Sequence, residues 1–291
     1  MARRKFSTRI WIVPAAIAGL CAVPRTADAV DTVPFTMRDG AVAVQGSIDG
    51  TPAVPMLVDL GAGVDVLSSS VGRRYVVVKG KYVSLRLTGE RVDLPIGTVN
   101  SFAMGGIPIE APHVGIWGGL DGTGVDGLIS ATAFRNIATT FDFTNHKIVI
   151  EDAETFPERR RTAARIPLIL QDDLGIALGL FARFDFGGGK SGLCEIDTST
   201  SGITIDDALA PSLGIDVRDP HLSRTPSPSG DRVRAQIASI SLEGDTQAAL
   251  ARPTVTFGNL IYDCNVGTDF WAGRTFTLDL PDRALYVDST T

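Results

Sequence analysis

The chain contains the same series of segments twice, and this internal repeat limits its fold more than any other feature. Asp59 and Asp197 end matching apolar runs 138 residues apart, and two matching hairpins have aspartates, Asp142 and Asp279, 137 residues apart. The matching segments are 33–50 with 166–183, 54–70 with 191–205, and 141–152 with 278–289. A nearly constant spacing across three pairs indicates a duplicated unit, so we expect two similar lobes.

Each copy has the pattern of an all-β domain. Short strands of alternating apolar residues are separated by glycine-rich turns, with almost no 3.6-residue periodicity. Short helices are expected only within 130–137 and 266–273. We therefore predict an all-β protein with lobes at 30–151 and 166–291, joined by the polar, charged segment 152–165 as an exposed linker.

Residues 1–29 have the pattern of a signal peptide. Four basic residues between positions 3 and 9 precede the run IWIVPAAIAGLCAV, and Ala27-Asp28-Ala29 fits a cleavage site. The run is interrupted by Pro14 and is short for a membrane span. We expect an exported protein, periplasmic or secreted, that begins near Val30 and has no membrane span after cleavage.

The charge of the expected mature chain narrows the choice of partner. The full chain has 27 basic and 33 acidic residues, and cleavage after residue 29 removes five basic residues and one acidic residue. The 22 basic and 32 acidic residues that remain give a formal charge of −10. Such a surface repels phosphate backbones, which argues against nucleic acid as a partner.

Asp59 and Asp197 are a physical problem for the fold. Each one ends an apolar run and is followed by small residues and a second apolar run, as in a buried strand-turn-strand. A buried carboxylate without a partner is costly, so it needs a partner or a changed pKa. Each aspartate is the obvious partner of the other. The alternative is that both are turn or cap residues in a β-protein that binds an unrelated ligand.

These segments together resemble the pepsin/retropepsin superfamily of aspartic peptidases. In that superfamily each lobe has an apolar strand leading into D-[TS]-G-[AS], a flap hairpin, a hydrophobic-hydrophobic-glycine strand with a short helix, and a closing hairpin. The first motif reads Asp59-Leu60-Gly61-Ala62 in one lobe and Asp197-Thr198-Ser199-Thr200 in the other. The later landmarks are YVSLRLTGERVDL (82–94), DGLISATAF (126–134) and 141–143 in the first lobe, and SPSGDRVRAQIASISL (227–242), CNVGTDFW (264–271) and 278–280 in the second. The likeness covers almost all of residues 33–289.

The resemblance implies a bilobal pepsin-like acid protease fold, made of two retropepsin-like β-barrel lobes, with Asp59 and Asp197 as the catalytic pair in one cleft. Two adjacent carboxylates cannot both ionise, so they share one proton. The ionised group takes a proton from water and the protonated group donates to the scissile carbonyl, so neither a cofactor nor a metal is required. The partner would be a polypeptide substrate or a peptide ligand. Because one chain contains both lobes, a monomer can form the site.

The supporting residues only partly follow the superfamily pattern. The resemblance implies that Thr198 braces the pair across the lobes and that Gly61 allows a close backbone approach. Leu60 cannot supply the matching brace, and Ser199 has a side chain where the superfamily has glycine, as does Ser130 in the hydrophobic-hydrophobic-glycine strand. These departures leave two alternatives. The chain is either an active endopeptidase or a pseudoprotease that serves as a peptide-binding or scaffold module.

Two further features follow from the resemblance. The candidate flap is Leu87-Thr88-Gly89, without the tyrosine of pepsin-like enzymes. Cys194 and Cys264 precede Asp197 and Gly267 by three residues, on strands that are neighbours in the superfamily, so they form either a disulfide or two buried thiols.

Two other motifs are given structural interpretations. The run Ser68-Ser69-Ser70 has no histidine base nearby in the sequence and is predicted as polar surface at a strand end. The segment FGGGKSG (186–192) lacks the first glycine of a phosphate-binding loop and is predicted as a hairpin turn.

Overall fold

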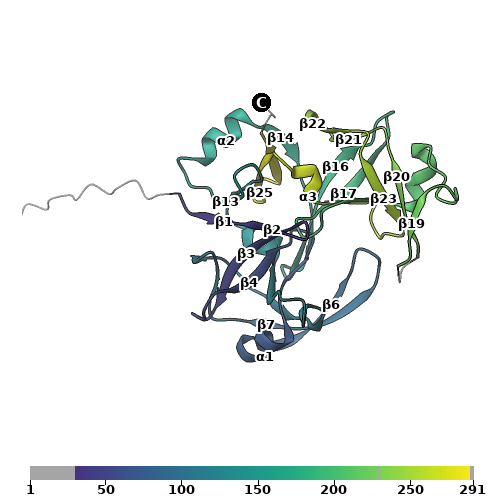
Figure 1. Ribbon diagram of the computed structural model, residues 1–291. Helices are drawn as coiled ribbons and strands as arrows, with labels where there is room; N and C mark the ends of the chain where they lie inside the picture. The colour runs from purple at the N-terminus through teal and green to yellow at the C-terminus, as the bar shows by residue number, and fades with distance from the viewer. Residues whose placement is uncertain (1–29, 228–229, 289–291) are drawn as a thin grey trace, which may run out of the picture.

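The computed structural model describes residues 30–227 and 230–288, and the predicted signal sequence, residues 1–29, lies outside the described residues. The described strands form three sheets, one in each of two lobes and one shared between them (Figure 1).

The sheets of the two lobes correspond strand for strand. In the first lobe the order is β6 (Val77–Leu85), β7 (Arg91–Thr98), β10 (Val114–Ile116), β5 (Asp65–Leu67), β11 (Gly127–Ile129), β4 (Val54–Val58), β3 (Ala41–Ile48), β8 (Phe102–Met104) and β9 (Ile107–Pro108), with β2 (Thr36–Arg38) paired to β3. In the second lobe it is β19 (Ser223–Thr225), β20 (Arg232–Gln236), β23 (Thr254–Gly258), β18 (Ile203–Asp206), β24 (Cys264–Val266), β17 (Ser191–Ile196), β16 (Ala177–Asp185), β21 (Ser239–Leu242) and β22 (Asp245–Ala251), with β15 (Ile169–Asp173) paired to β16. The internal repeat of the sequence is therefore a repeat of topology.

The third sheet joins the lobes through the two closing hairpins. Its order is β1 (Thr32–Pro34), β13 (Lys147–Ile150), β12 (Thr139–Asp142), β25 (Thr275–Asp279), β26 (Ala284–Val287) and β14 (Ala164–Pro167). Strands β12 and β25 pair antiparallel, with Thr140 opposite Thr277 and their Oγ1 atoms 2.6 Å apart. The neighbouring pair, Phe141 and Phe276, stacks with ring centroids 5.0 Å apart. Since Thr140 and Thr277 occupy equivalent places in the repeat, the pseudo-two-fold axis runs between them.

The helices are short, and two of them fall within the predicted segments: η2 (Ala131–Phe134) and α3 (Thr268–Trp271). Four others were not predicted: α1 (Ser69–Tyr75), η1 (Gly118–Leu120), α2 (Phe156–Thr162) and η3 (Asp207–Leu213). Helices of this length are too short to show a clear apolar period. None of the described helices is long and apolar enough to cross a membrane.

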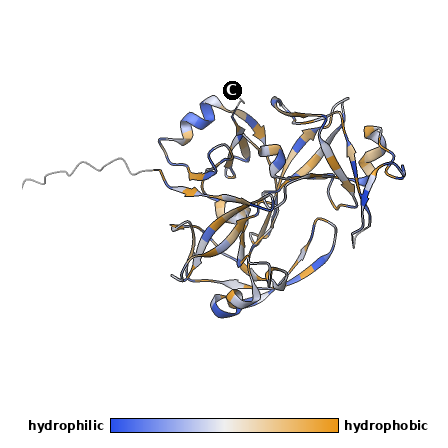
Figure 2. Cartoon of the chain, in the orientation of Figure 1, coloured by the Kyte–Doolittle hydropathy of each residue, from blue (hydrophilic) through white to orange (hydrophobic). Residues whose placement is uncertain are grey.

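Helix α2 lies in the segment that joins the lobes and is hydrophilic over most of its length (Figure 2). Its Arg159 has guanidinium nitrogens 3.4 Å from Glu151 Oε1 and 3.0 Å from Asp288 Oδ2, at the residues that directly follow β13 and β26 of the shared sheet.

Helix α1 corrects one expectation. The run 68–70 was predicted as polar surface at a strand end. It follows the end of β5 and Ser70 is exposed, but Ser68 is 2% exposed and Ser69 begins the helix. The prediction of a turn at 186–192 is confirmed, because residues 186–190 connect β16 to β17.

The main apolar core extends through both lobes and the shared sheet. Phe270 and Trp271 of α3 are fully buried in it, and the Trp271 ring lies 4.5 Å from that of Phe276. A smaller cluster occurs in the first lobe, where Val66, Leu94, Ile96 and Leu128 pack together. This cluster lies beside the functional site described below.

We predict that Phe276→Ala destabilises the protein by about 3–5 kcal/mol, because it leaves a cavity where the two closing hairpins meet. Chemical unfolding monitored by fluorescence measures the change. Val83→Ala, at a side chain that is 46% exposed on β6, is the control and should cost less than about 1 kcal/mol. Equal effects for the two variants would contradict a central role for the shared sheet.

Candidate active site

A cleft of about 1070 Å³ lies between the lobes, and both Asp59 and Asp197 line it. Each aspartate follows a central strand, β4 or β17, and is tied to the neighbouring strand in the same way. The Asp59 N–H donates to the carbonyl of Ile129 at 2.8 Å, and the Asp197 N–H donates to the carbonyl of Val266 at 3.1 Å. The backbone therefore presents the two carboxyl groups symmetrically.

Backbone N–H groups hold each carboxyl group. Asp59 Oδ1 accepts hydrogen bonds from the N–H groups of Gly61 at 3.0 Å and Ala62 at 2.9 Å. Asp197 Oδ1 accepts from the Ser199 N–H at 2.7 Å and from the Ser199 hydroxyl at 2.8 Å. Ser199 therefore fits the site and adds a donor, although it departs from the superfamily's glycine.

Gly61 brings the first loop against the second carboxyl group. A Cβ at this position would lie 3.1 Å from Asp197 Cγ and 3.2 Å from its Cβ, so a side chain would crowd that carboxyl group. Burial, followed by the nearby Asp197 carboxylate, raises the pKa of Asp59, while hydrogen bonds from Ser199, Ala62 and Gly61 oppose the rise. The Asp197 carboxylate is thus close enough to influence the proton of Asp59.

Thr198 connects the two loops. Its hydroxyl donates to the carbonyl of Val58 at 2.6 Å and accepts from the Leu60 N–H at 3.1 Å, in the opposite lobe. Leu60 is fully buried and has no hydroxyl to return the contact. The side-chain brace is therefore present on one side only.

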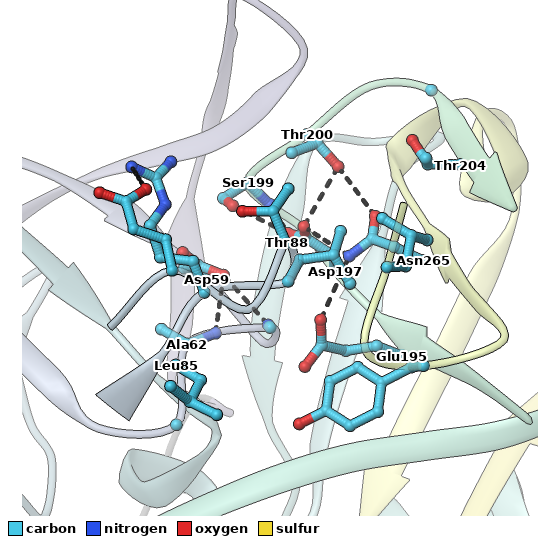
Figure 3. Close-up of a pocket in the computed structure, with 18 of the residues that line it drawn as sticks. Asp59, Ala62, Leu85, Thr88, Glu195, Asp197, Ser199, Thr200, Thr204 and Asn265 are labelled. Atoms are coloured by element: carbon cyan, nitrogen blue, oxygen red, sulfur yellow. Dashed lines mark hydrogen bonds and ion pairs between the residues drawn. The ribbon is translucent and has the colours of Figure 1, made fainter. Parts of the chain in front are cut away.

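A buried acidic residue that was not predicted from the sequence, Glu195, lies beside the pair in the cleft. The Asn265 amide nitrogen lies 3.0 Å from Asp197 Oδ2 and 3.3 Å from Glu195 Oε2, so it links the two acids (Figure 3). Burial and the Asp197 carboxylate raise the pKa of Glu195 to about 8. The strand pattern of the sequence could have predicted this residue. Side chains alternate between the two faces of a strand, and Glu195 precedes Asp197 by two residues, so both side chains lie on one face.

The candidate flap lies over the cleft. Leu87, Thr88 and Gly89 form the tip of the β6–β7 hairpin and line the cleft. The carbonyl of Leu87 accepts a hydrogen bond of 3.0 Å from the Ile261 N–H of the second lobe. The tip therefore bridges the two lobes.

Cys194 and Cys264 form a disulfide between β17 and β24. They are direct neighbours in the strand register, and the next pair in that register is Glu195 with Asn265. The crosslink thus lies beside the strand segments that carry Asp197 and its hydrogen-bond partners.

The two hydrophobic-hydrophobic-glycine strands end differently. A Cβ at Gly267 would lie 2.5 Å from the carbonyl oxygens of Thr200 and Gly202, so this position requires glycine. The equivalent Ser130 donates its N–H at 2.6 Å to a fully buried carboxyl group, Asp65, which Thr132 also contacts. Burial raises the pKa of Asp65 to about 7.

Within residues 30–227 and 230–288, no group of three or more histidine, cysteine, aspartate or glutamate side chains is placed to hold a metal ion.

Solved structures with the same architecture include an aspartic proteinase from Irpex lacteus, with a TM-score of 0.55 and 15% identity, covering 90% of this chain and 98% of that chain. Basic 7S globulin from soybean has a TM-score of 0.53 and 12% identity, covering 90% of this chain and 96% of that chain. No protein-family model matches the sequence, and no curated protein sequence matches it. At these identities the likeness shows the fold alone. The predicted all-β, bilobal pepsin-like fold is confirmed.

We predict that Thr198→Val lowers the free energy of unfolding by about 1–3 kcal/mol, because the Leu60 N–H and the Val58 carbonyl lose their partner in a buried place. Chemical unfolding measures the loss. Thr198→Ser keeps the hydroxyl and should recover most of the stability. If the valine and serine variants are equally stable, the hydroxyl does not brace the lobes.

Asp65 should make the protein less stable as the pH rises. Its pKa is raised in the fold to about 7, so its contribution is complete below the usual value of 3.8 and is lost as the pH passes through 7. Between about pH 4 and pH 8 we expect a loss on the order of 2–4 kcal/mol from this group. Asp65→Asn should flatten that slope in urea unfolding, whereas the exposed Asp216→Asn should not. An unchanged slope in Asp65→Asn would contradict this assignment.

Proposed function

We propose that the chain is an exported aspartic-type endopeptidase that hydrolyses peptide bonds in extended polypeptides, with Asp59 and Asp197 as its catalytic residues. The observation that carries the proposal is the symmetrical placement of the two carboxyl groups in one cleft, with Gly61 packed against Asp197. The pepsin-like fold supports the same chemistry.

The protonation of the pair suits general acid–base catalysis. The raised pKa of Asp59 favours a state in which one proton is shared by the two carboxyl groups. The ionised carboxylate takes a proton from a water molecule as the water oxygen attacks the scissile carbonyl carbon. The protonated carboxyl group donates its proton to the carbonyl oxygen. The resulting diol collapses when the carboxyl group that took the water proton gives it to the departing nitrogen, the other carboxylate takes back a proton from a diol hydroxyl, and the C–N bond breaks.

The flap would hold the substrate in the cleft. An extended peptide can pair with the backbone of the flap in the manner of an added strand. The hydrogen bond between Leu87 and Ile261 closes the tip onto the second lobe, so entry of a peptide requires its release. Leu87, Thr88 and Gly89 are accordingly assigned to substrate enclosure.

Export agrees with two observations. The signal-like segment precedes the first strand, and the Cys194–Cys264 disulfide is typical of an oxidising compartment. We therefore propose a periplasmic or secreted monomer with catalytic lobes at 30–151 and 166–291 joined by residues 152–165, and with no nucleic acid partner.

The second candidate is a pseudoprotease that binds peptides without cutting them. The missing brace at Leu60 favours it, because a catalytic pair loses orders of magnitude in rate when its geometry is loosened. Both candidates use the same cleft, so only a measurement of hydrolysis separates them.

Purified protein lacking residues 1–29 should cleave an unfolded protein substrate at some pH between about 3 and 8. Asp59→Asn and Asp197→Asn should each lower the rate by at least about 1,000-fold, because each removes one half of the proton exchange. Mass spectrometry of the products measures the cleavage, and a statine-type transition-state mimic should inhibit it.

Asp216→Asn, at an exposed aspartate outside the cleft, is the matched control and should remain fully active. Folded wild-type protein that binds peptide but cuts nothing across this pH range would overturn the endopeptidase proposal in favour of the binding module.

A further inference from the structure

The two walls of the cleft differ in chemistry. The second-lobe wall is formed by polar and charged residues of strands β17, β24, β18, β23 and β20, and the first-lobe wall includes the apolar Val66, Leu94 and Leu128. In the second lobe, a row of directly opposed residues runs across neighbouring strands from the proposed catalytic pair outward. In order from β17 through β24, β18 and β23 to β20, the row is Glu195, Asn265, Thr204, Thr256 and Arg234. Opposed residues on paired strands share one face, and all five line the cleft.

The first lobe has an apolar row in the same register. In order from β4 through β11, β5 and β10 to β7, it is Leu57, Leu128, Val66, Gly115 and Ile96. Val66, Ile96 and Leu128 belong to the small apolar cluster of that lobe. The two lobes therefore share the strand register at these positions but differ in the polarity of the side chains.

Two arginines give the second-lobe wall its charge. Arg232 and Arg234 alternate along β20, are both exposed, and line the cleft. Their equivalents in the first lobe, Leu94 and Ile96, are buried. Among the described residues neither guanidinium forms an ion pair, although the chain as a whole is acidic.

We propose that this wall is a subsite for an acidic side chain, aspartate or glutamate, of an extended peptide whose neighbouring apolar residue lies on the first-lobe wall. The inference rests on the proposed function only in taking the cleft as a peptide site. A guanidinium binds a carboxylate with two parallel hydrogen bonds, and the hydroxyls of Thr204 and Thr256 add neutral donors along the same row.

Glu195, at the inner end of the row, does not reverse the preference for an acidic side chain. Glu195 is 7% exposed, and the Asn265 amide contacts its carboxyl group. Arg232 and Arg234 are the exposed charges on β20, whereas the exposed Asp269, which also lines the cleft from the second lobe, lies on α3. A lysine or arginine of the peptide beside β20 therefore meets like charge.

The test measures binding, independently of cleavage. The first set consists of short end-blocked alanine peptides with a central Leu-Phe pair and one glutamate, which is placed in turn at each of the remaining positions. The second set has glutamine in place of glutamate. In the Asp59→Asn background, calorimetry should show at least one position where glutamate binds about tenfold more tightly than glutamine. The advantage should shrink as salt is added.

Substitutions of the arginines test whether the second-lobe wall binds the glutamate. Arg232→Gln and Arg234→Gln should each remove most of the advantage of glutamate, whereas Arg218→Gln, at a 91% exposed side chain outside the cleft, should leave it unchanged. The subsite is overturned if no position favours glutamate, if a lysine set binds more tightly, or if the advantage survives both substitutions in the wall.

The outcomes for the two proposals are distinct. Cleavage by the wild type without any preference for glutamate keeps the endopeptidase and removes the subsite. A preference for glutamate that depends on Arg232 and Arg234, in a protein that cleaves nothing, keeps the subsite and removes the endopeptidase.

Discussion

The pairing of β12 with β25 is the interaction on which the rest of the structure depends. Each lobe can form most of its hydrogen bonds alone, whereas this shared sheet joins the lobes by continuous strand pairing, to which Thr198 and the flap tip add further contacts between the lobes. Thr140 and Thr277 meet at its centre, with the stacked rings of Phe141 and Phe276 beside them. The symmetry of this contact places the loops after β4 and β17 opposite each other. The cleft and its two carboxyl groups therefore follow from how two hairpins pair.

Burying acids in this cleft is costly, and the structure offsets the cost with donors from the backbone and from neighbouring side chains. Asp59 receives two N–H groups, and Asp197 receives the N–H and hydroxyl of Ser199 together with the Asn265 amide. Glu195 receives only the Asn265 amide among the contacts described, and burial together with the Asp197 carboxylate raises its pKa to about 8. The effect of burial and the number of hydrogen-bond donors thus differ between Asp59 and Glu195, so the pKa values of these two acids are raised to different extents.

The repeat in the sequence was sufficient to predict the fold class, because the spacing between copies and the closing hairpins depend on strand pattern alone. The cross-lobe contact of Thr198 also followed the motif. Glu195 and Asn265 were missed because the superfamily pattern leads one to expect apolar residues there, although alternation with Asp197 was visible. The polar row that ends at Arg234 could not be predicted, since it exists only once the register of the strands is known.

The difference between the two walls has a physical basis in how sheets are held together. Strand register is fixed by backbone hydrogen bonds and by the buried face, so residues that face an open cleft can change without cost to the fold. After duplication the loops that hold the carboxyl groups were constrained by close packing, as at Gly61 and Gly267. The exposed arginines of the second-lobe wall are not packed in this way, whereas their first-lobe equivalents, Leu94 and Ile96, are buried. The first-lobe wall belongs to an apolar cluster beneath the flap hairpin, whereas the second-lobe wall has hydroxyls and exposed arginines. A single chain with two lobes can therefore present unlike surfaces to the two sides of one extended ligand, which a symmetric pair of identical lobes cannot do.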